Sequence, residues 1–418
     1  MKKGFLISLL IFTINCKKDN DILEDILDPS IDLIDSGNSQ LKKIIPCIDG
    51  LAGQYECNGY DLIGHLSLSE LETEMANDSW GWTDSKTGKE YALVGTYEGT
   101  AFIDISEPVN PLYLGKLVSA TEPSTWRDIK VFNDYAFIVS EAKDHGLQIF
   151  DLKKLREIKG STTFESDLVY NKFGAAHNIF INEKTGYAYI LGNRDMYKGG
   201  PIFINISDPL NPILEGGYES KEYVHDAQIV IYDGPDEDYK GKEIYVGSHG
   251  SQSSENLVVI LDVTNKNDPK FISEITYSDA GYAHQGFFSE NQRYFFLGDE
   301  LDEVNFGTKT RTFIFDFTDL NNPFLSFINS GPTKAIDHNG YIKNNLFYLA
   351  NYSAGVRIFD ISKIENKSME EVGFFDTYNK NNSTEFNGVW NVFPFFDSNN
   401  IILSDLNSGL FIIKSNKL

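Results

Sequence analysis

The sequence predicts an all-β fold, a seven-bladed β-propeller built from four-stranded blades. One short phrase recurs seven times, at a spacing of roughly 45 to 57 residues, which is the length of one blade. Two other strand-like runs precede the phrase in each unit. A further strand-like segment lies before the first unit and can supply the strand that the last unit lacks.

The recurring phrase consists of a small residue or Gly, an alternating apolar run, an Asp or Asn, and then Ser or Thr. Alternation of this kind is typical of a strand in a sheet. The copies occupy residues 99–108, 146–151, 200–209, 257–264, 312–318, 355–362 and, in shortened form, 409–415. Two unrelated β-sandwiches are the alternative, but seven matched phrases favour one repeating architecture.

The other strands of each unit follow from aromatic and β-branched composition. A run rich in Tyr or Phe comes just before each phrase, as in residues 135–139 and 187–191, and a fourth strand follows it, as in residues 112–117. The last unit ends after its third strand. Residues 60–68 alternate like a strand, so we expect them to complete the last blade and close the ring, which removes open sheet edges.

The first residues resemble an export signal rather than part of the fold. A basic start and an apolar run at residues 4–14, too short for a permanent membrane helix, precede Cys16. The pattern resembles the lipoproteins of Bacteroidetes and implies a signal peptide at residues 1–15 and a lipidated Cys16. An ordinary secretory signal with an incidental cysteine is the alternative. Polar, acidic residues 16–45 then predict a flexible tether, which leaves residues 46–418 for the propeller.

The net charge bears on the class of partner, and the cysteine content predicts one disulfide. The chain carries a formal net charge of −25, which argues against nucleic acid as a partner. Apart from Cys16, the only thiols are those of Cys47 and Cys57. In an oxidising compartment we expect them to form one disulfide that closes a short loop.

Several motifs resemble those of the LVIVD-repeat proteins, and specifically the choice-of-anchor B family. The likeness covers about residues 45–418. It rests on residues 47–57, 126–131, 146–151, 176–179, 225–236, 284–286, 298–303 and 337–339. The resemblance implies an outer-membrane lipoprotein exposed at the cell surface, held to the membrane through Cys16. It implies no established reaction, and no functional residue is carried over from it.

A candidate ligand-binding face follows from propeller geometry. The innermost strand of each blade and the loop between its second and third strands meet at one face, around the mouth of the central channel. Polar pairs open five of the innermost strands, and the loops add further polar residues. The predicted face contains Arg127, Asp128, Glu141, His177, Asn178, Arg194, His225, Asp226, His249, His284, Gln285, Asp299, Glu300, His338 and Asn339.

Three interpretations of this face stay open. The histidines can serve only structure, by bonding backbone groups and channel water. They can hold a polar organic ligand, or His177, His225, His284 and His338 can bind a divalent metal ion. A separate acidic loop with Asp233, Asp236 and Asp238 offers hard oxygen ligands for calcium, although a solvated hairpin turn is the favoured interpretation there.

The functional prediction is a surface binding or scaffold module that takes a carbohydrate, peptide or protein at the channel mouth. Trp80, Trp82, Trp126 and Trp390 lie near first-strand starts and would suit such contacts. Recognised catalytic motifs of serine hydrolases, zinc proteases and phosphate-binding loops are absent from the sequence. A metal-assisted hydrolase or lyase that uses the same face is the alternative, and a purely structural surface component is a third hypothesis.

Overall fold

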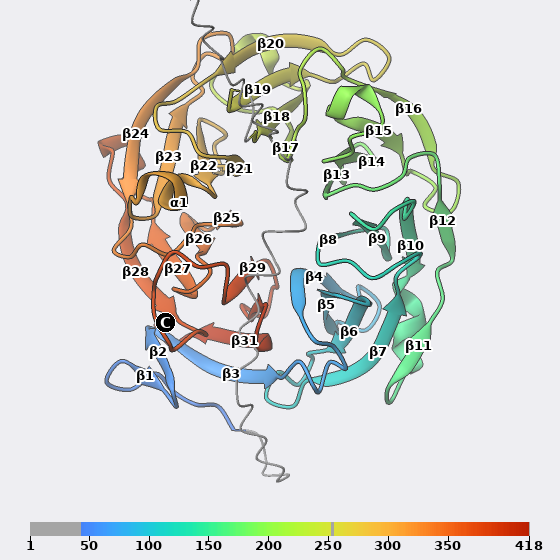
Figure 1. The fold of residues 1–418 in the computed structure, drawn as a ribbon, viewed down its shortest axis with the longest axis vertical. Helices are drawn as coiled ribbons and strands as arrows, with labels where there is room; N and C mark the ends of the chain where they lie inside the picture. Colours follow the sequence, from blue (N-terminus) through green and yellow to red (C-terminus); the bar gives the residue numbers. More distant parts are fainter. Residues whose placement is uncertain (1–42, 252–254, 418) are drawn as a thin grey trace, which may run out of the picture. The chain divides into compact units, whose positions relative to one another are not determined.

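The computed structural model describes residues 43–251 and 255–417, and these form seven antiparallel sheets around a central axis (Figure 1). The seven-bladed β-propeller predicted from the repeats is confirmed. The predicted signal peptide at residues 1–15, the lipidation site Cys16 and nearly all of the predicted tether lie outside the described residues. None of the helices in the described part of the chain is long and apolar enough to cross a membrane.

The blades follow one another along the chain, and the strands of each blade are numbered from the axis outward. Blade 1 contains β4 (Ala76–Thr83), β5 (Glu90–Thr96), β6 (Gly99–Asp104) and β7 (Leu112–Val118). Blade 2 contains β8 (Arg127–Phe132), β9 (Tyr135–Ser140), β10 (Leu147–Asp151) and β12 (Leu168–Tyr170). Blade 3 contains β13 (Asn178–Asn182), β14 (Tyr187–Leu191), β15 (Ile202–Asn205) and β16 (Ile213–Gly217).

The remaining four blades repeat this order. Blade 4 contains β17 (Asp226–Ile231), β18 (Glu243–His249), β19 (Leu257–Asp262) and β20 (Lys270–Ile275). Blade 5 contains β21 (Ala283–Phe288), β22 (Tyr294–Asp299), β23 (Arg311–Asp316) and β24 (Phe324–Ser330), with helix α1 (Asp302–Phe306) between β22 and β23. Blade 6 contains β25 (Gly340–Lys343), β26 (Leu346–Ala350), β27 (Val356–Asp360) and β28 (Glu370–Phe375). Blade 7 contains β29 (Val389–Phe393), β30 (Ile401–Asp405), β31 (Gly409–Ser415) and β3 (Tyr60–Leu66).

The recurring Asp or Asn has a local structural role in five blades. It ends the third strand, and its side-chain oxygen accepts the backbone N–H of the Ser or Thr two residues later, a turn that mimics a backbone turn. The oxygen-to-nitrogen distance is 3.0 Å for Asp104, 3.0 Å for Asp262 and 2.7 Å for Asp360. The phrase therefore marks the point at which each chain segment leaves its third strand.

The N-terminal segment closes the ring. Strand β3 pairs antiparallel with β31, from Tyr60 opposite Ser415 to Leu66 opposite Leu410, as the alternation of residues 60–68 predicts. Gly64 leaves room for the neighbouring blade, because a Cβ at this position would lie 2.0 Å from the carbonyl oxygen of Pro108. The seventh sheet is thereby built from both ends of the propeller.

The segment before β3 binds the sixth blade. Strands β1 (Leu51–Ala52) and β2 (Tyr55–Asn58) extend its sheet, and β2 pairs with the outer strand β28. The predicted disulfide between Cys47 and Cys57 is present and closes this small hairpin. The segment thus spans two blades, which ties the closing strand to its neighbour.

One feature of the sheets was not predicted. Between β10 and β12 the chain makes a detour through the 3₁₀ helix Leu152–Glu157 and strand β11 (Thr162–Phe164). Strand β11 adds a fifth strand to blade 1, parallel to β7, with Thr162 opposite Gly115. Phe164 packs edge-on against Phe102 and Phe150, so the detour also fills the space between blades 1 and 2.

Candidate functional site

Six of the innermost strands begin, at the same end of the channel, with side chains that meet in one pocket. The space not occupied by atoms is about 240 Å³, and this includes open solvent at the mouth of the pocket. The residues that line it are Trp126, Arg127, His177, Asn178, His225, His284, His338, Asn339 and Trp390. Seven of them belong to the predicted face. Of the four tryptophans singled out in the sequence, Trp126 and Trp390 line the pocket, whereas Trp80 and Trp82 pack among other aromatic rings and side chains.

The second member of most polar pairs bridges neighbouring blades. Asn178 donates to the carbonyl of His225 at 3.0 Å, and the Oδ2 of Asp128 accepts the backbone N–H of Ile179 at 2.8 Å. Gln285 accepts the backbone N–H of Gly340 at 2.9 Å. These side chains form hydrogen bonds with backbone N–H and C=O groups of the next blade, which the sheet hydrogen bonds leave without a partner. The second positions therefore serve mainly structure, although Asn178 and Asn339 also line the pocket, as all five first positions do.

The four histidines form a continuous row along the pocket wall. Ring centroids are 4.4 Å apart between His177 and His225, 4.2 Å between His225 and His284, and 4.3 Å between His284 and His338. Rings this close cannot all carry a charge, because like charges in a buried site repel strongly. The row must therefore contain mainly neutral imidazoles.

Burial and mutual repulsion set the protonation of three of these rings. Burial lowers the pKa of His225 and of His284 well below the usual value, and the neighbouring histidines lower both further. Burial also lowers the pKa of His338 to about 3. The Nδ1 atoms of His225 and His338 face the carbonyl oxygens of His284 at 3.0 Å and Trp390 at 2.6 Å. Since a carbonyl can only accept, each Nδ1 carries the proton and each Nε2 keeps a lone pair.

His177 differs from the other three because a carboxylate touches it. Its Nδ1 lies 2.7 Å from Oε1 of Glu141. Burial by itself would lower the pKa of His177, but the charge and hydrogen bond of Glu141, together with the charges of Glu300 and Asp128, outweigh it and raise that pKa. In the same way, burial opposes the charge on Glu141 but His177 overcomes it and lowers the pKa of that carboxyl. The two residues form a buried ion pair at the edge of the pocket.

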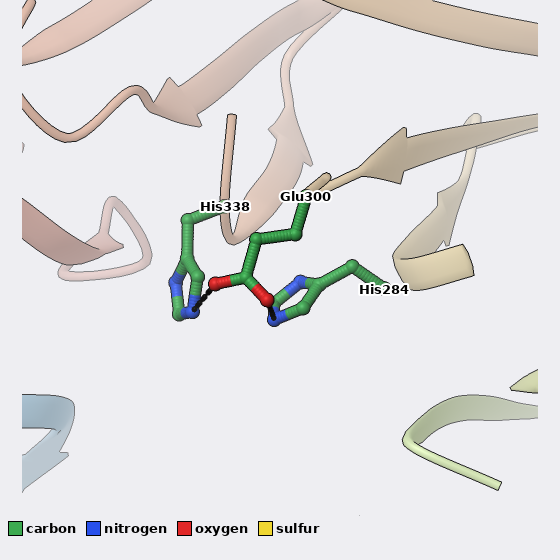
Figure 2. Close-up of side chains that lie close together, drawn as sticks. All are labelled: His284, Glu300 and His338. Atoms are coloured by element: carbon green, nitrogen blue, oxygen red, sulfur yellow. Dashed lines mark ion pairs between the residues drawn. The ribbon is translucent and has the colours of Figure 1, made fainter. Parts of the chain in front are cut away.

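Glu300 lies between the last two histidines of the row (Figure 2). Its Oε2 is 3.7 Å from Nε2 of His284, and its Oε1 is 3.6 Å from Nε2 of His338. The hydroxyl of Tyr352 donates to Oε1 at 3.1 Å. Burial raises the pKa of Glu300 to about 7. One oxygen of Glu300 and one ring nitrogen from each of His284 and His338 lie within 4.8 Å of one another, which is a donor set that suits a transition metal.

Arg127 brings a buried positive charge to the opposite side of the row. Its side chain is almost fully buried, at 2% exposure. Its Nε contacts the carbonyl of Thr96 at 3.4 Å and its Nη1 donates to Nε2 of His145 at 3.1 Å. Within the described part of the chain, Nη2 has no hydrogen-bond partner and no carboxylate pairs with the guanidinium. Burial lowers the pKa of Arg127 to about 10, so it stays charged at neutral pH.

Several predicted face residues lie outside the pocket. Asp226 sits deeper in the channel, where burial and the nearby Asp128 carboxylate raise its pKa to about 7. Asp299 accepts the Tyr277 hydroxyl at 2.7 Å and three backbone N–H groups. His249 contacts the carbonyl of Glu222 at 3.1 Å, and the guanidinium of Arg194 stacks over the ring of Tyr223. These side chains support the loops around the mouth.

The acidic loop predicted as a calcium candidate has another use in the structure. Asp236 accepts the backbone N–H of Asp238 at 3.2 Å and, with its second oxygen, that of Leu320 at 2.9 Å. Asp233 donates its backbone N–H to Gln292. Over the described residues, Asp233, Asp236 and Asp238 do not bring ligand atoms within 4.8 Å of one another. The loop is a hairpin turn that contacts blade 5.

The sequence did not predict which residues form hydrogen bonds with Arg127 and Glu300 in the pocket. His145, which receives the hydrogen bond from Arg127, lies in a loop and carries no pattern of its own. The sequence predicts that the loop with Tyr352 lies at this face, but not that its hydroxyl donates to Glu300. Asp302, Glu303 and Asp337 form a second group of possible ligands beside the pocket. They stand within two or three residues of Glu300 and His338, so the acidic run at residues 299–303 was the available signal.

Comparison with known proteins supports the fold but assigns no function. No family model and no curated protein matches the chain. A solved structure of a protein from Lactobacillus plantarum is similar with a TM-score of 0.52 and 14% identity, over 80% of this chain and 91% of that one. A putative 6-phosphogluconolactonase from Bacteroides fragilis NCTC 9343 has a TM-score of 0.51 and 13% identity, over 77% and 89%. A functionally unknown protein from Desulfotomaculum acetoxidans DSM 771 has a TM-score of 0.51 and 11% identity, over 75% and 89%.

The ion pair at the pocket edge makes a prediction about pH. In Glu141→Gln the attraction disappears and burial dominates, so the pKa of His177 falls below its usual value of about 6.5. NMR titration of the imidazole measures this directly.

In the wild type the ion pair of Glu141 and His177 stabilises the fold fully between the usual pKa values of Glu and His, about 4.3 and 6.5. Its contribution is lost as the pH rises through the raised pKa of His177 or falls through the lowered pKa of Glu141. An unchanged His177 titration in the variant would show that the pair does not form.

Proposed function

We propose that this propeller is a binding module that captures an anionic group of its ligand at the channel mouth. The observation that carries this proposal is the unpartnered Nη2 of the buried Arg127 in the pocket wall. A buried guanidinium without a carboxylate is costly, and a ligand carboxylate could accept two hydrogen bonds from such a group. The ion-paired ring of His177, in the next blade, adds a second positive group to the pocket.

A carboxylate-bearing carbohydrate suits the remaining lining best. Trp126 is half-buried and its ring could pack against the C–H face of a sugar, whereas Trp390 is buried against His338 and Tyr352 and lines the pocket wall; Asn178 and Asn339 are polar neighbours. The Nε2 lone pairs of His225 and His338 can accept hydroxyl hydrogen bonds. The enclosed part of the pocket has room for about one water molecule, so an acidic group would approach the pocket and the sugar that bears it would lie over the mouth. Peptide carboxylates share the anionic group but would make less use of the Trp126 ring.

The Arg127 proposal predicts a loss of affinity for acidic ligands. Isothermal titration with an oligogalacturonate and with a neutral oligosaccharide of the same length should show binding of the acidic one only. Arg127→Gln should weaken it by about tenfold or more, since a hydrogen bond to a charged group contributes about 1.5–3 kcal/mol. Arg357→Gln is the matched control, because Arg357 is equally buried but pairs with Glu371 outside the pocket. Equal affinity in the wild type and Arg127→Gln would refute the proposal.

We also propose that the module is held at the cell surface as an outer-membrane lipoprotein, as a member of the choice-of-anchor B family. The support is the apolar run followed by Cys16 and an acidic, polar segment. Lipid on Cys16 would anchor the chain through its acyl groups. A Cys16→Ser chain is expected to leave the membrane fraction while the wild type stays in it, and whole-cell labelling would report surface exposure. Retention of Cys16→Ser in membranes would contradict the anchor.

A metal-assisted hydrolase or lyase is the second candidate, favoured by the set His284, Glu300 and His338. Ligands 2.0–2.1 Å from a tetrahedral metal lie about 3.3–3.4 Å apart. Each histidine lies 3.6 or 3.7 Å from a different oxygen of Glu300, and one ligand atom of each of the three residues lies within 4.8 Å of the others. The Nδ1 of His338 is already held by a carbonyl and Glu300 by Tyr352, as the ligands of metal centres usually are. Three protein ligands would leave a fourth position open to the pocket, where a bound ion could activate water.

Metal analysis tests this second candidate. The wild-type protein, equilibrated with zinc and dialysed, should retain one ion per chain, whereas His284→Ala and His338→Ala should retain at least about tenfold less. His249→Gln serves as the control, because His249 is buried outside the pocket lining. Retention of zinc by both alanine variants would exclude this set as the binding site.

A further inference from the structure

Three buried carboxylates gather beside the pocket, behind Glu300 and His338. Asp302 and Glu303 belong to α1, and Asp337 stands just before His338. Their exposures are 0%, 2% and 0%. One oxygen of each lies within 4.8 Å of one oxygen of the other two. Three acids in a dry site need partners, because an uncompensated buried charge is expensive.

Most of these oxygens have no partner. Arg311 donates from Nε to Oδ2 of Asp302 at 2.7 Å. In contrast, no described side chain donates to an oxygen of Glu303 or Asp337, and the nearby backbone N–H groups of Glu303 and Asp299 are too poorly placed to form standard hydrogen bonds with them. Gly298 makes room for the carboxylate of Asp337, since a Cβ there would lie 2.6 Å from its Oδ2. The fold thus places a fully buried, unpartnered carboxylate next to two other acids.

The local charges do not balance. Three ionised carboxylates and the guanidinium of Arg311 leave two negative charges. Two further acids face the cluster, but Asp299 is satisfied by the Tyr277 hydroxyl and backbone N–H groups, and Glu300 faces the histidines. Burial and the neighbouring carboxylates raise the pKa of both Glu303 and Asp337, and the backbone N–H of Asp299 only partly opposes this for Asp337. The carboxylates can be neutralised by protons that they share or by a cation with two charges.

We propose that Asp302, Glu303 and Asp337 bind one divalent cation with a preference for oxygen ligands, and that calcium fits best. The cluster offers carboxylate oxygens and no nitrogen or sulfur donor, which disfavours zinc and copper. Calcium takes oxygens at 2.3–2.6 Å, so two ligands of one ion can be up to about 4.8 Å apart, which this cluster satisfies. The four unpartnered oxygens can supply most of a coordination shell, and bound water can complete it.

The ion would join two blades under the pocket. Asp302 and Glu303 follow strand β22 of blade 5, in the segment that carries Glu300. Asp337 precedes strand β25 of blade 6, in the segment that carries His338. Binding would therefore hold these two segments together. The inference concerns a separate set of residues and does not rest on the ligand proposed for the pocket.

Calcium binding and thermal melting of the full chain test this site. Protein stripped with EDTA and given calcium at about 1 mM, the upper range for extracellular modules, should bind one ion per chain and melt at a higher temperature. Asp337→Asn and Glu303→Gln should lose both the ion and the shift. In EDTA these variants should melt no lower than the wild type, because each replaces an uncompensated carboxylate with a neutral group of the same shape. Asp233→Asn, in the acidic hairpin, should keep the ion and the shift.

Two results would overturn the site. A wild-type protein that binds no calcium and melts at the same temperature in EDTA and in calcium would show that the cluster is held by shared protons instead. Full retention of the ion by Asp337→Asn and Glu303→Gln would place it elsewhere. If both variants fail to fold, the wild-type and Asp233→Asn ion counts still decide: one ion in each supports the site, and none refutes it.

Discussion

Closure of the ring is the constraint on which the rest of the structure depends. Strand β3 joins the last sheet from the other end of the propeller, so seven sheets must share one axis. The innermost strands then come close enough for side chains to bond across blades, as Asn178 does to His225 and Gln285 to Gly340. Without closure there would be no channel, and residues more than one hundred positions apart would not meet.

The close packing of titratable side chains around the channel axis shifts their pKa values and leaves some charges without a partner. Water is excluded, so each charge there needs a partner or must be neutralised. Glu141 and His177 meet this requirement with each other, and the other three histidines meet it by staying neutral. Arg127 and the carboxylates of Glu303 and Asp337 do not meet it with protein groups. These exceptions lie around one pocket, and they are the reason that both proposals concern ions.

The comparison of sequence and structure separates two kinds of residue. Strand positions were predictable because blades repeat, and the polar pairs at first-strand starts could be placed at one mouth by geometry alone. The sequence could not separate Arg127 and His177, which line the pocket, from Asp128, which bridges blades. His145 and the detour through β11 follow no repeat and were missed, and the hydrogen bond from Tyr352 to Glu300 could not be predicted from the position of its loop.

By itself, the sequence determined the architecture: seven blades, the closing strand at residues 60–66, the disulfide of Cys47 and Cys57, and the end of the channel at which the histidines gather. These features arise from local periodicity and repetition, which a chain carries at every blade. Only the tertiary structure decided which groups are buried together, and hence which nitrogens keep lone pairs, which guanidinium lacks a partner and which carboxylates share a site. Such properties depend on distances between blades and on the loss of water, and no single segment encodes either of them.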